Sequence, residues 1–139
     1  MSLQAMQPIL FVSSIEQSVD FYQEKLGFDL GFAITGDGGR MLHASVVNGA
    51  VTLMLAYADP IVERRLGGGA ELYVYVDDVD EYFERVLAVG TVPSRDIEDQ
   101  FWGERTFTVT DPDGYVITFA QSMRAFDPAR DIPAIPVTV

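Results

Sequence analysis

This chain has no cysteine, one histidine and one tryptophan. Without cysteine it cannot form a disulfide framework, a thiolate zinc site or a cysteine nucleophile. No stretch approaches ~20 consecutive apolar residues, which a membrane-spanning helix requires. No apolar run follows a basic segment at the N-terminus, so we expect no secretory signal and a cytoplasmic location.

Basic residues are also scarce. Nine lysines and arginines stand against 21 acidic residues, which gives a net charge of −12. Such a chain lacks the basic surface that nucleic acids and anionic membranes require, so we expect neither as a partner. Its field would attract a cationic small molecule. The alternative is that the acidic surface only maintains solubility.

The 139 residues, of which 48% are hydrophobic, suit one domain with a packed core. The first half contains candidate strands at 7–12, 29–34, 40–47 and 51–57. A helix follows the first strand, with Ser13 or Ser14 as its N-cap and Gly27 at its end. Asn48-Gly49 is the predicted hairpin turn.

The second half repeats this plan about 64 residues later. Candidate strands lie at 71–76, 92–97, 105–110 and 115–121, with a helix capped by Asp77 or Asp78 and ended by Gly90. A turn at 111–114 joins the last two strands. Gly67-Gly68-Gly69 is interpreted as a flexible linker between the halves. The chain thus divides into an N-terminal extension (1–6), a domain (7–121) with modules 7–66 and 70–121, and a proline-containing tail (122–139).

Strand alternation predicts which side chains meet a ligand. Leu72, Val74 and Val76 share one face and should pack on the helix. Glu71, Tyr73 and Tyr75 share the other, concave face. In the first half this face should hold Gln7, with His43 opposite Met54. In the second half Phe107 is predicted beside Thr118, and Arg105 beside Ala120.

Three segments carry a family resemblance: PILFVSSIEQSVDFYQEKLGF, LYVYVDDVDEYFERV and FWGERTFTVTDPDGYVITF. In this order and spacing the chain resembles the vicinal oxygen chelate superfamily, which includes glyoxalase I, bleomycin-resistance proteins and extradiol dioxygenases. The resemblance implies an α+β fold in which two βαβββ modules form a cupped, mixed eight-stranded sheet. It also implies a homodimer with pockets near the interface.

Enzymes of this superfamily typically bind a divalent metal at four equivalent strand positions. Carried onto this chain, those positions hold Gln7, Met54, Glu71 and Thr118. A thioether and a neutral hydroxyl are poor substitutes for carboxylates at a hard divalent ion. We therefore expect no metal and no other cofactor, and we assign no catalytic residue.

The predicted ligand-binding residues combine these positions with aromatic and polar neighbours. Trp102 and Phe32 offer flat rings, and Glu71 offers a carboxylate that either Arg105 or a cationic ligand could pair with. Arg105 could instead pair with Asp111. The complete set is Gln7, Phe32, His43, Met54, Glu71, Tyr73, Trp102, Arg105 and Thr118.

Three functions remain open from the sequence. The first is a metal-independent binding protein similar to the bleomycin-resistance branch, which would sequester a small molecule, with a cationic aromatic compound as the candidate. The second is a metal-dependent lyase, isomerase or dioxygenase in which Gln7, Glu71 and His43 converge on an ion. The third is a dimerising regulatory module with a vestigial pocket.

Overall fold

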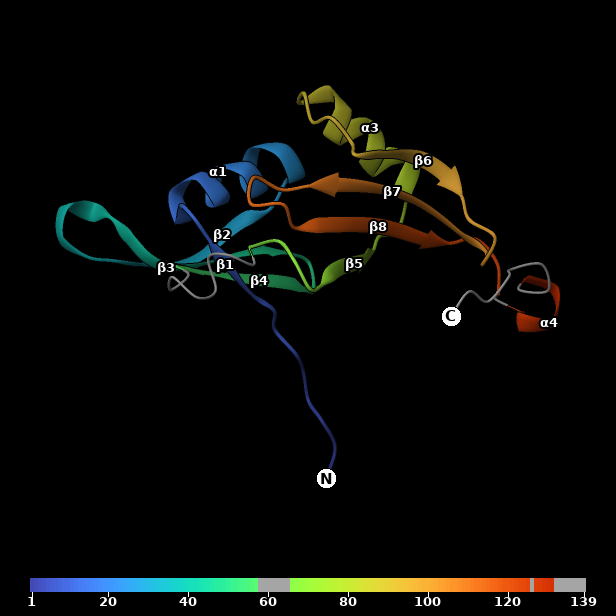
Figure 1. Ribbon diagram of the computed structural model, residues 1–139, viewed down its shortest axis with the longest axis horizontal. Helices are drawn as coiled ribbons and strands as arrows, with labels where there is room; N and C mark the ends of the chain where they lie inside the picture. Colours follow the sequence, from blue (N-terminus) through green and yellow to red (C-terminus); the bar gives the residue numbers. More distant parts are fainter. Residues whose placement is uncertain (58–65, 126, 132–139) are drawn as a thin grey trace.

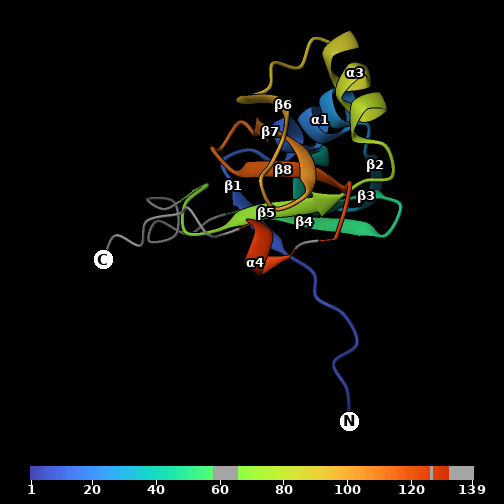
Figure 2. The same cartoon turned by 90° about the vertical axis from the view of Figure 1, so that its right-hand side faces the viewer.

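The computed structural model describes residues 1–57, 66–125 and 127–131. Two βαβββ modules follow one another in the chain and form two four-stranded mixed sheets, in the orders β1-β4-β3-β2 and β5-β8-β7-β6. The two sheets lie side by side along the long axis, and helices α1 and α3 lie on the same side of them (Figures 1 and 2). The predicted α+β class and repeated module are confirmed.

The first module contains β1 (Ile9–Val12), α1 (Ile15–Leu26), β2 (Asp29–Thr35), the short helix η1 (Asp37–Gly39), β3 (Met41–Asn48) and β4 (Val51–Tyr57). Ser14 is the N-cap of α1, because its side chain accepts a hydrogen bond from the Gln17 backbone N–H. Gly27 ends α1 in the left-handed conformation that glycine tolerates best. Both signals were predicted from the sequence.

The second module contains β5 (Glu71–Tyr75), α3 (Val79–Ala88), β6 (Arg95–Asp99), β7 (Glu104–Thr110) and β8 (Val116–Ser122). Asp78 caps α3 by accepting from the Glu81 backbone N–H. Beyond β8, a single helical turn, α4 (Pro128–Asp131), begins at a proline, the position where proline costs a helix least. The remaining prolines of the tail, Pro133 and Pro136, fall outside the described residues.

The repeat is visible in the strand registers. β1 pairs with β4 in parallel, with Ile9 beside Met54, and β5 pairs with β8 in parallel, with Tyr73 beside Thr118. Each member of the second pair lies 64 residues after its counterpart in the first. The 64-residue frame is therefore confirmed for these four strands.

The hairpin registers differ from the prediction. Asn48 pairs with Val51, so the turn is Gly49-Ala50, with Gly49 at positive φ in its first central position. A single glycine there is enough for a tight hairpin turn, and Asn48 stays in the strand. Its side-chain amide donates to the Gly27 carbonyl. As a result Ser45, and not His43, lies opposite Met54.

In the second module the error is one residue and changes the face. Thr108 lies beside Thr118 and Phe107 beside Phe119, while Arg105 lies beside Gln121. The physical reason is a longer turn: Asp111 accepts hydrogen bonds from the backbone N–H groups of Asp113 and Tyr115 and holds a loop that the first hairpin lacks. Glu104, Thr106 and Thr108 therefore share a face with Thr118.

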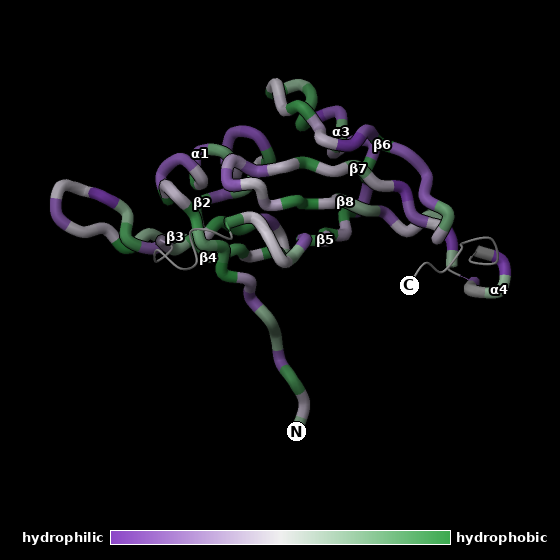
Figure 3. The backbone as a smooth tube through the Cα atoms, viewed as in Figure 1, coloured by the Kyte–Doolittle hydropathy of each residue, from purple (hydrophilic) through white to green (hydrophobic). Residues whose placement is uncertain are grey.

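The core lies between the sheets and the two helices. Leu10, Leu55 and Val46 of the first sheet and Phe107, Ile117 and Phe119 of the second are almost fully buried on this side. Hydrophobic residues dominate the central strands of the first module, and the helices alternate between hydrophilic and hydrophobic stretches (Figure 3). We call the opposite side of the two sheets, which carries Ile9, Phe11, Phe32, Tyr73, Tyr75 and Glu104, the open face.

Hydrogen bonds tie the two modules together across the core. The Tyr22 hydroxyl on α1 donates to Asp111 Oδ2 at 2.8 Å, and the Tyr82 hydroxyl on α3 donates to the Leu26 carbonyl at 2.7 Å. The Gly67 end of the linker is held closely: a Cβ at Gly67 would lie 2.5 Å from the Asp113 carbonyl oxygen. The glycine segment thus packs against the second module at this position, which the flexible-linker interpretation did not foresee.

Candidate functional site

The four positions that resemble a metal site form two pairs, one at each sheet. Met54 lies in β4 beside Ile9, while Gln7 precedes β1 and is exposed. Thr118 lies in β8 beside Tyr73, and Glu71 is exposed at the start of β5. The two pairs belong to different sheets.

This donor set does not fit a divalent metal. Among residues 1–57, 66–125 and 127–131, no three histidine or acidic side chains lie where they could hold an ion together. The Thr118 hydroxyl is engaged with the Thr108 hydroxyl at 2.9 Å. A thioether and a hydroxyl that is already bonded leave Glu71 as the one charged ligand of the four.

Arg105 lies on the helix side of the second sheet. Its guanidinium pairs with Asp80, in the first turn of α3, at 3.1 Å and with Asp99, in β6, at 3.2 Å. The predicted pairing of Arg105 with Glu71 or with Asp111 is therefore wrong. These contacts fasten α3 to the β6–β7 edge and direct Arg105 away from Tyr73 and Thr118.

On the open face of the second sheet, Glu104 is the centre of an aromatic cluster. The Tyr73 hydroxyl donates to Glu104 Oε1, and the Trp102 indole N–H donates to the same oxygen at 2.6 Å. The Trp102 N–H also lies 3.3 Å from the Tyr73 hydroxyl. The Tyr73 and Tyr75 rings meet edge to face, with centroids 5.5 Å apart. We call Tyr73, Tyr75, Trp102 and Glu104 the Glu104 cluster.

The electrostatics of the cluster keep Glu104 ionised. Burial raises the pKa of its carboxyl. Hydrogen bonds from Tyr73, Tyr75 and Trp102 together lower that pKa by more, so the net pKa lies below the ordinary value. Burial and then the Glu104 carboxylate raise the pKa of Tyr73 to about 12, so this phenol remains a neutral donor. The cluster therefore presents one negative charge surrounded by aromatic rings.

A cavity of about 370 Å³ opens beside the cluster and is lined by Tyr75, Trp102, Glu104, Ser122, Arg124 and Ala125. Arg124 donates to the Phe101 carbonyl at 3.0 Å and so holds the 101–103 turn that carries Trp102. Gly103, at positive φ, leaves room for it: a Cβ there would lie 2.9 Å from the Arg124 backbone oxygen. The indole is thus fixed by its turn as well as by Glu104.

The open face of the first sheet has different chemistry. The Phe32 ring stacks on His43, with centroids 5.6 Å apart and an angle of 20° between the planes. The Phe32 backbone N–H donates to the buried Ser45 hydroxyl. Together with Ile9 and Met54, these residues form an apolar surface without a carboxylate.

Of the predicted ligand-binding residues, the structure groups Tyr73, Trp102 and Thr118 on the open face of the second sheet and Phe32, His43 and Met54 on that of the first. Gln7 and Glu71 lie at strand entrances. Glu104 was missed, although it precedes Thr106 and Thr108 in strict alternation. That alternation, combined with the correct register, would have identified it.

Comparisons with known proteins agree with this architecture. A family model described as the Glyoxalase/Bleomycin resistance protein/Dioxygenase superfamily matches residues 4–119. The chain belongs to this superfamily. It is 30% identical over 127 residues to the bleomycin resistance proteins of Geobacillus stearothermophilus and Staphylococcus aureus, and the match covers 85% of this chain and 96% of each of theirs.

Solved structures give the same answer. TnmS3 from Streptomyces sp. CB03234, described as an antibiotic binding protein, superposes with a TM-score of 0.72 and 30% identity, covering 88% of this chain and 98% of that one. TioX from Micromonospora sp. ML1 superposes with a TM-score of 0.69 and 27% identity, covering 86% and 98%. None of the helices in the described residues is both long enough and apolar enough to span a membrane.

Proposed function

We propose that this protein binds a planar, cationic small molecule at the Glu104 cluster, without a metal ion, and acts by sequestering it. The observation that carries the proposal is the convergence of Trp102 and Tyr73 on one ionised carboxylate. A cation beside Glu104 would gain both the carboxylate charge and the faces of the surrounding rings. Similarity to bleomycin resistance proteins and to an antibiotic binding protein supports the ligand class.

Each feature of the site has a part in this function. The Trp102 ring and the 64%-exposed Tyr75 ring offer surfaces for stacking a planar group. Glu104 is already oriented by its donors, so little ordering cost is left for binding. The net charge of −12 would accelerate capture of a cation from solution.

The experiment is calorimetric titration of the protein with metal-free bleomycin and with proflavine, a minimal planar cation. We expect saturable binding by the wild type and about 10- to 150-fold weaker binding by Glu104→Gln, because a charged hydrogen-bonding partner contributes roughly 1.5–3 kcal/mol. Quenching of Trp102 fluorescence reports the same site. Binding should be unchanged after dialysis against a chelator.

Glu84→Gln is the matched control, because it removes the same charge from an exposed position on α3. An equal loss in both variants would reduce the role of Glu104 to its share of the overall field and would contradict the proposal. Absence of binding of both compounds by the wild type would also contradict it, as would stoichiometric metal that both ligands require.

We further propose that the chain forms a homodimer through the open face of the first sheet. Four large apolar side chains are exposed there: Ile9 (48%), Phe11 (36%), Phe32 (43%) and Ile34 (55%). Exposed apolar side chains gathered on one face of a sheet favour contact with another chain. Sedimentation velocity should show a dimer that Ile34→Glu shifts to monomer. Leu42→Glu, at a 51%-exposed position of the opposite strand parity, should not do so.

A further inference from the structure

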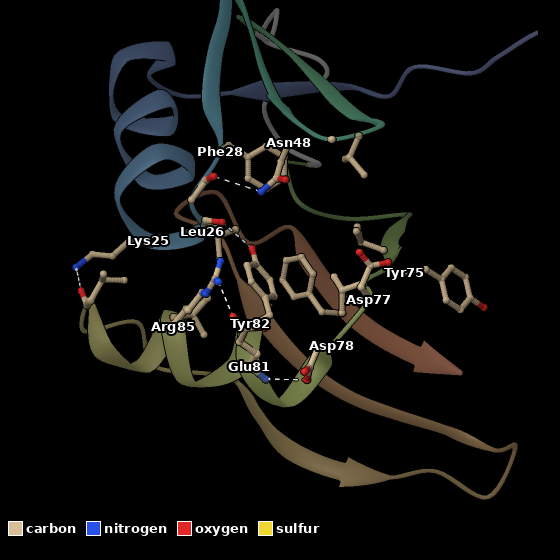
Figure 4. Close-up of a pocket in the computed structure, with 18 of the residues that line it drawn as sticks. Lys25, Leu26, Phe28, Asn48, Tyr75, Asp77, Asp78, Glu81, Tyr82 and Arg85 are labelled. Carbon is tan, nitrogen blue, oxygen red and sulfur yellow. Dashed lines mark hydrogen bonds and ion pairs between the residues drawn. The ribbon is translucent and has the colours of Figure 1, made fainter. Parts of the chain in front are cut away.

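A larger cavity lies away from the open face, between the two modules. It has a volume of about 680 Å³ and is bounded by the end of α1, the β3–β4 turn, the end of β5 and the length of α3. Figure 4 shows Lys25, Leu26 and Phe28 on one side and Asp77, Asp78, Glu81 and Arg85 on the other. We call this cavity the intermodule cleft.

Hydrogen bonds between the two modules border the cleft. The Tyr82 hydroxyl reaches the Leu26 carbonyl across its floor, and Lys25 Nζ donates to the Val89 carbonyl at 3.1 Å. The Asn48 side-chain amide closes one side of the cleft by donating a hydrogen bond to the Gly27 carbonyl. Between these contacts the side chains of Val51, Val74 and Val76 are only half-buried, and they leave an apolar floor of a size that drug-sized ligands occupy.

The rim of the cleft is acidic. Its charged residues are Glu24, Asp77, Asp78, Glu81, Lys25 and Arg85. Both basic groups are engaged: Arg85 pairs with Glu81, and Lys25 with the Val89 carbonyl. Asp78 is engaged as the N-cap of α3. Within the part of the chain that the structure describes, Glu24 and Asp77 form neither a hydrogen bond nor an ion pair, and the four acidic and two basic groups together give the rim a net charge of −2.

We infer that the intermodule cleft is a second binding site, for a bulky hydrophobic monocation. The apolar floor from both modules would receive the body of the ligand, and Glu24 and Asp77 would attract its charge. A compact, three-dimensional body suits this cavity, which has walls on several sides, whereas the Glu104 cluster offers ring surfaces for a flat ligand. A bound ligand would contact both modules and would stabilise their packing.

The cleft and the Glu104 cluster are separate sites with one shared side chain. Among the residues that the structure describes, only Tyr75 lines both cavities. Trp102 lines the smaller cavity and not the cleft. Binding in the cleft is therefore distinguishable from the proposed function, because it leaves the indole without a direct ligand contact.

The test uses tetraphenylphosphonium and tetraphenylborate, two ions of the same shape and opposite charge. In ¹H–¹⁵N spectra of the full chain, the cation should shift the amides of Gly27, Gly49 and Asp77 with saturation, and the anion should bind at least about tenfold more weakly. Trp102 fluorescence should stay unchanged. Equal affinity for both ions would overturn the inference, as would a fluorescence change without shifts at the cleft amides.

Two variants locate the site. Ala50→Trp should abolish binding, because Ala50 lines the cleft at an exposed turn position with ordinary φ. Ala88→Trp is its control and should leave binding unchanged, because Ala88 lies on α3 outside the cleft. Asp77→Asn should weaken binding about threefold at ~0.1 M salt, an effect that screening by added salt should diminish. Glu84→Gln is its matched control. Unchanged affinity in both Ala50→Trp and Asp77→Asn would refute the cleft as the site.

Discussion

The two halves of this protein use the same backbone frame to present different chemistry. By the 64-residue frame, Ile9 is equivalent to Tyr73, Phe11 to Tyr75 and Met54 to Thr118, and all of them lie on the open face. In the first half these side chains are apolar. In the second half each one carries a hydroxyl, and a carboxylate, Glu104, lies among them.

The difference shows that the shared backbone frame does not determine the chemistry of the open face. Strand alternation and helix packing need only the buried sets, such as Leu55 and Phe119, to stay hydrophobic. The open-face residues are free of that requirement. The second sheet therefore carries the polar aromatic cluster, while the first carries exposed apolar side chains on its open face.

The buried sides of the halves also differ, and this gives the largest expected effect. Phe107 contacts the rings of Tyr82, Phe83 and Phe119, whereas the equivalent strand position in the first half is Ala44. Phe107→Ala should lower the free energy of unfolding by about 3–5 kcal/mol, because it removes a buried ring and leaves a cavity. Urea denaturation followed by circular dichroism measures the loss.

Ala44→Gly is the comparison in the first half and should cost about 1 kcal/mol or less. A single shared transition in Phe107→Ala would show that the halves unfold together, and two transitions would show that the second half unfolds first. A loss below ~1 kcal/mol would contradict the packing of the second half as described here.

The two tyrosines that join the halves offer a sharper and smaller comparison. Tyr22 donates to the buried Asp111 carboxylate, while Tyr82 donates to a neutral carbonyl. Tyr22→Phe should cost about 1.5–3 kcal/mol at pH 7, and Tyr82→Phe about 0.5–1.5 kcal/mol. Urea denaturation at pH 4 and pH 7 distinguishes a charged from a neutral acceptor.

The pH dependence follows from Asp111. Burial raises the pKa of its carboxyl, its hydrogen bonds to Tyr115, Tyr22 and Asp113 lower it, and the net pKa lies above the ordinary value. The folded state therefore holds this proton more tightly, and stability falls as pH rises from the ordinary value through the raised one. Losing the Tyr22 bond raises the pKa further, so the cost of Tyr22→Phe should be larger at pH 7 than at pH 4. Equal costs at both pH values would contradict this account.

Local signals in the sequence predicted much of the fold. Ser14, Gly27 and Asp78 mark helix ends by side-chain capping or by tolerance of positive φ, and these effects depend only on neighbouring residues. The 64-residue frame followed from comparing the halves. Both could be predicted because neither requires knowledge of contacts distant in the sequence.

The candidate site was harder to predict, because hairpin register depends on turn length. The turn at Gly49-Ala50 moved His43 by two residues, which kept it on the open face. The longer turn after Thr110 moved β7 by one residue, which exchanged Arg105 for Glu104. A single error thus placed a residue of the helix side in the predicted site and left out the carboxylate.

The longer second hairpin also has a consequence for how such a repeat diverges. The pairs Ser45–Met54 and Thr108–Thr118 show that β7 follows β3 by 63 residues, while β8 follows β4 by 64. The extra residue lies in the turn, where Asp111 binds it on one side and reaches Tyr22 on the other. A one-residue insertion within a strand would turn the following side chains to the opposite face of the sheet. Here the additional residue is confined to a loop, and Asp111 of that loop joins the two halves through its hydrogen bond with Tyr22.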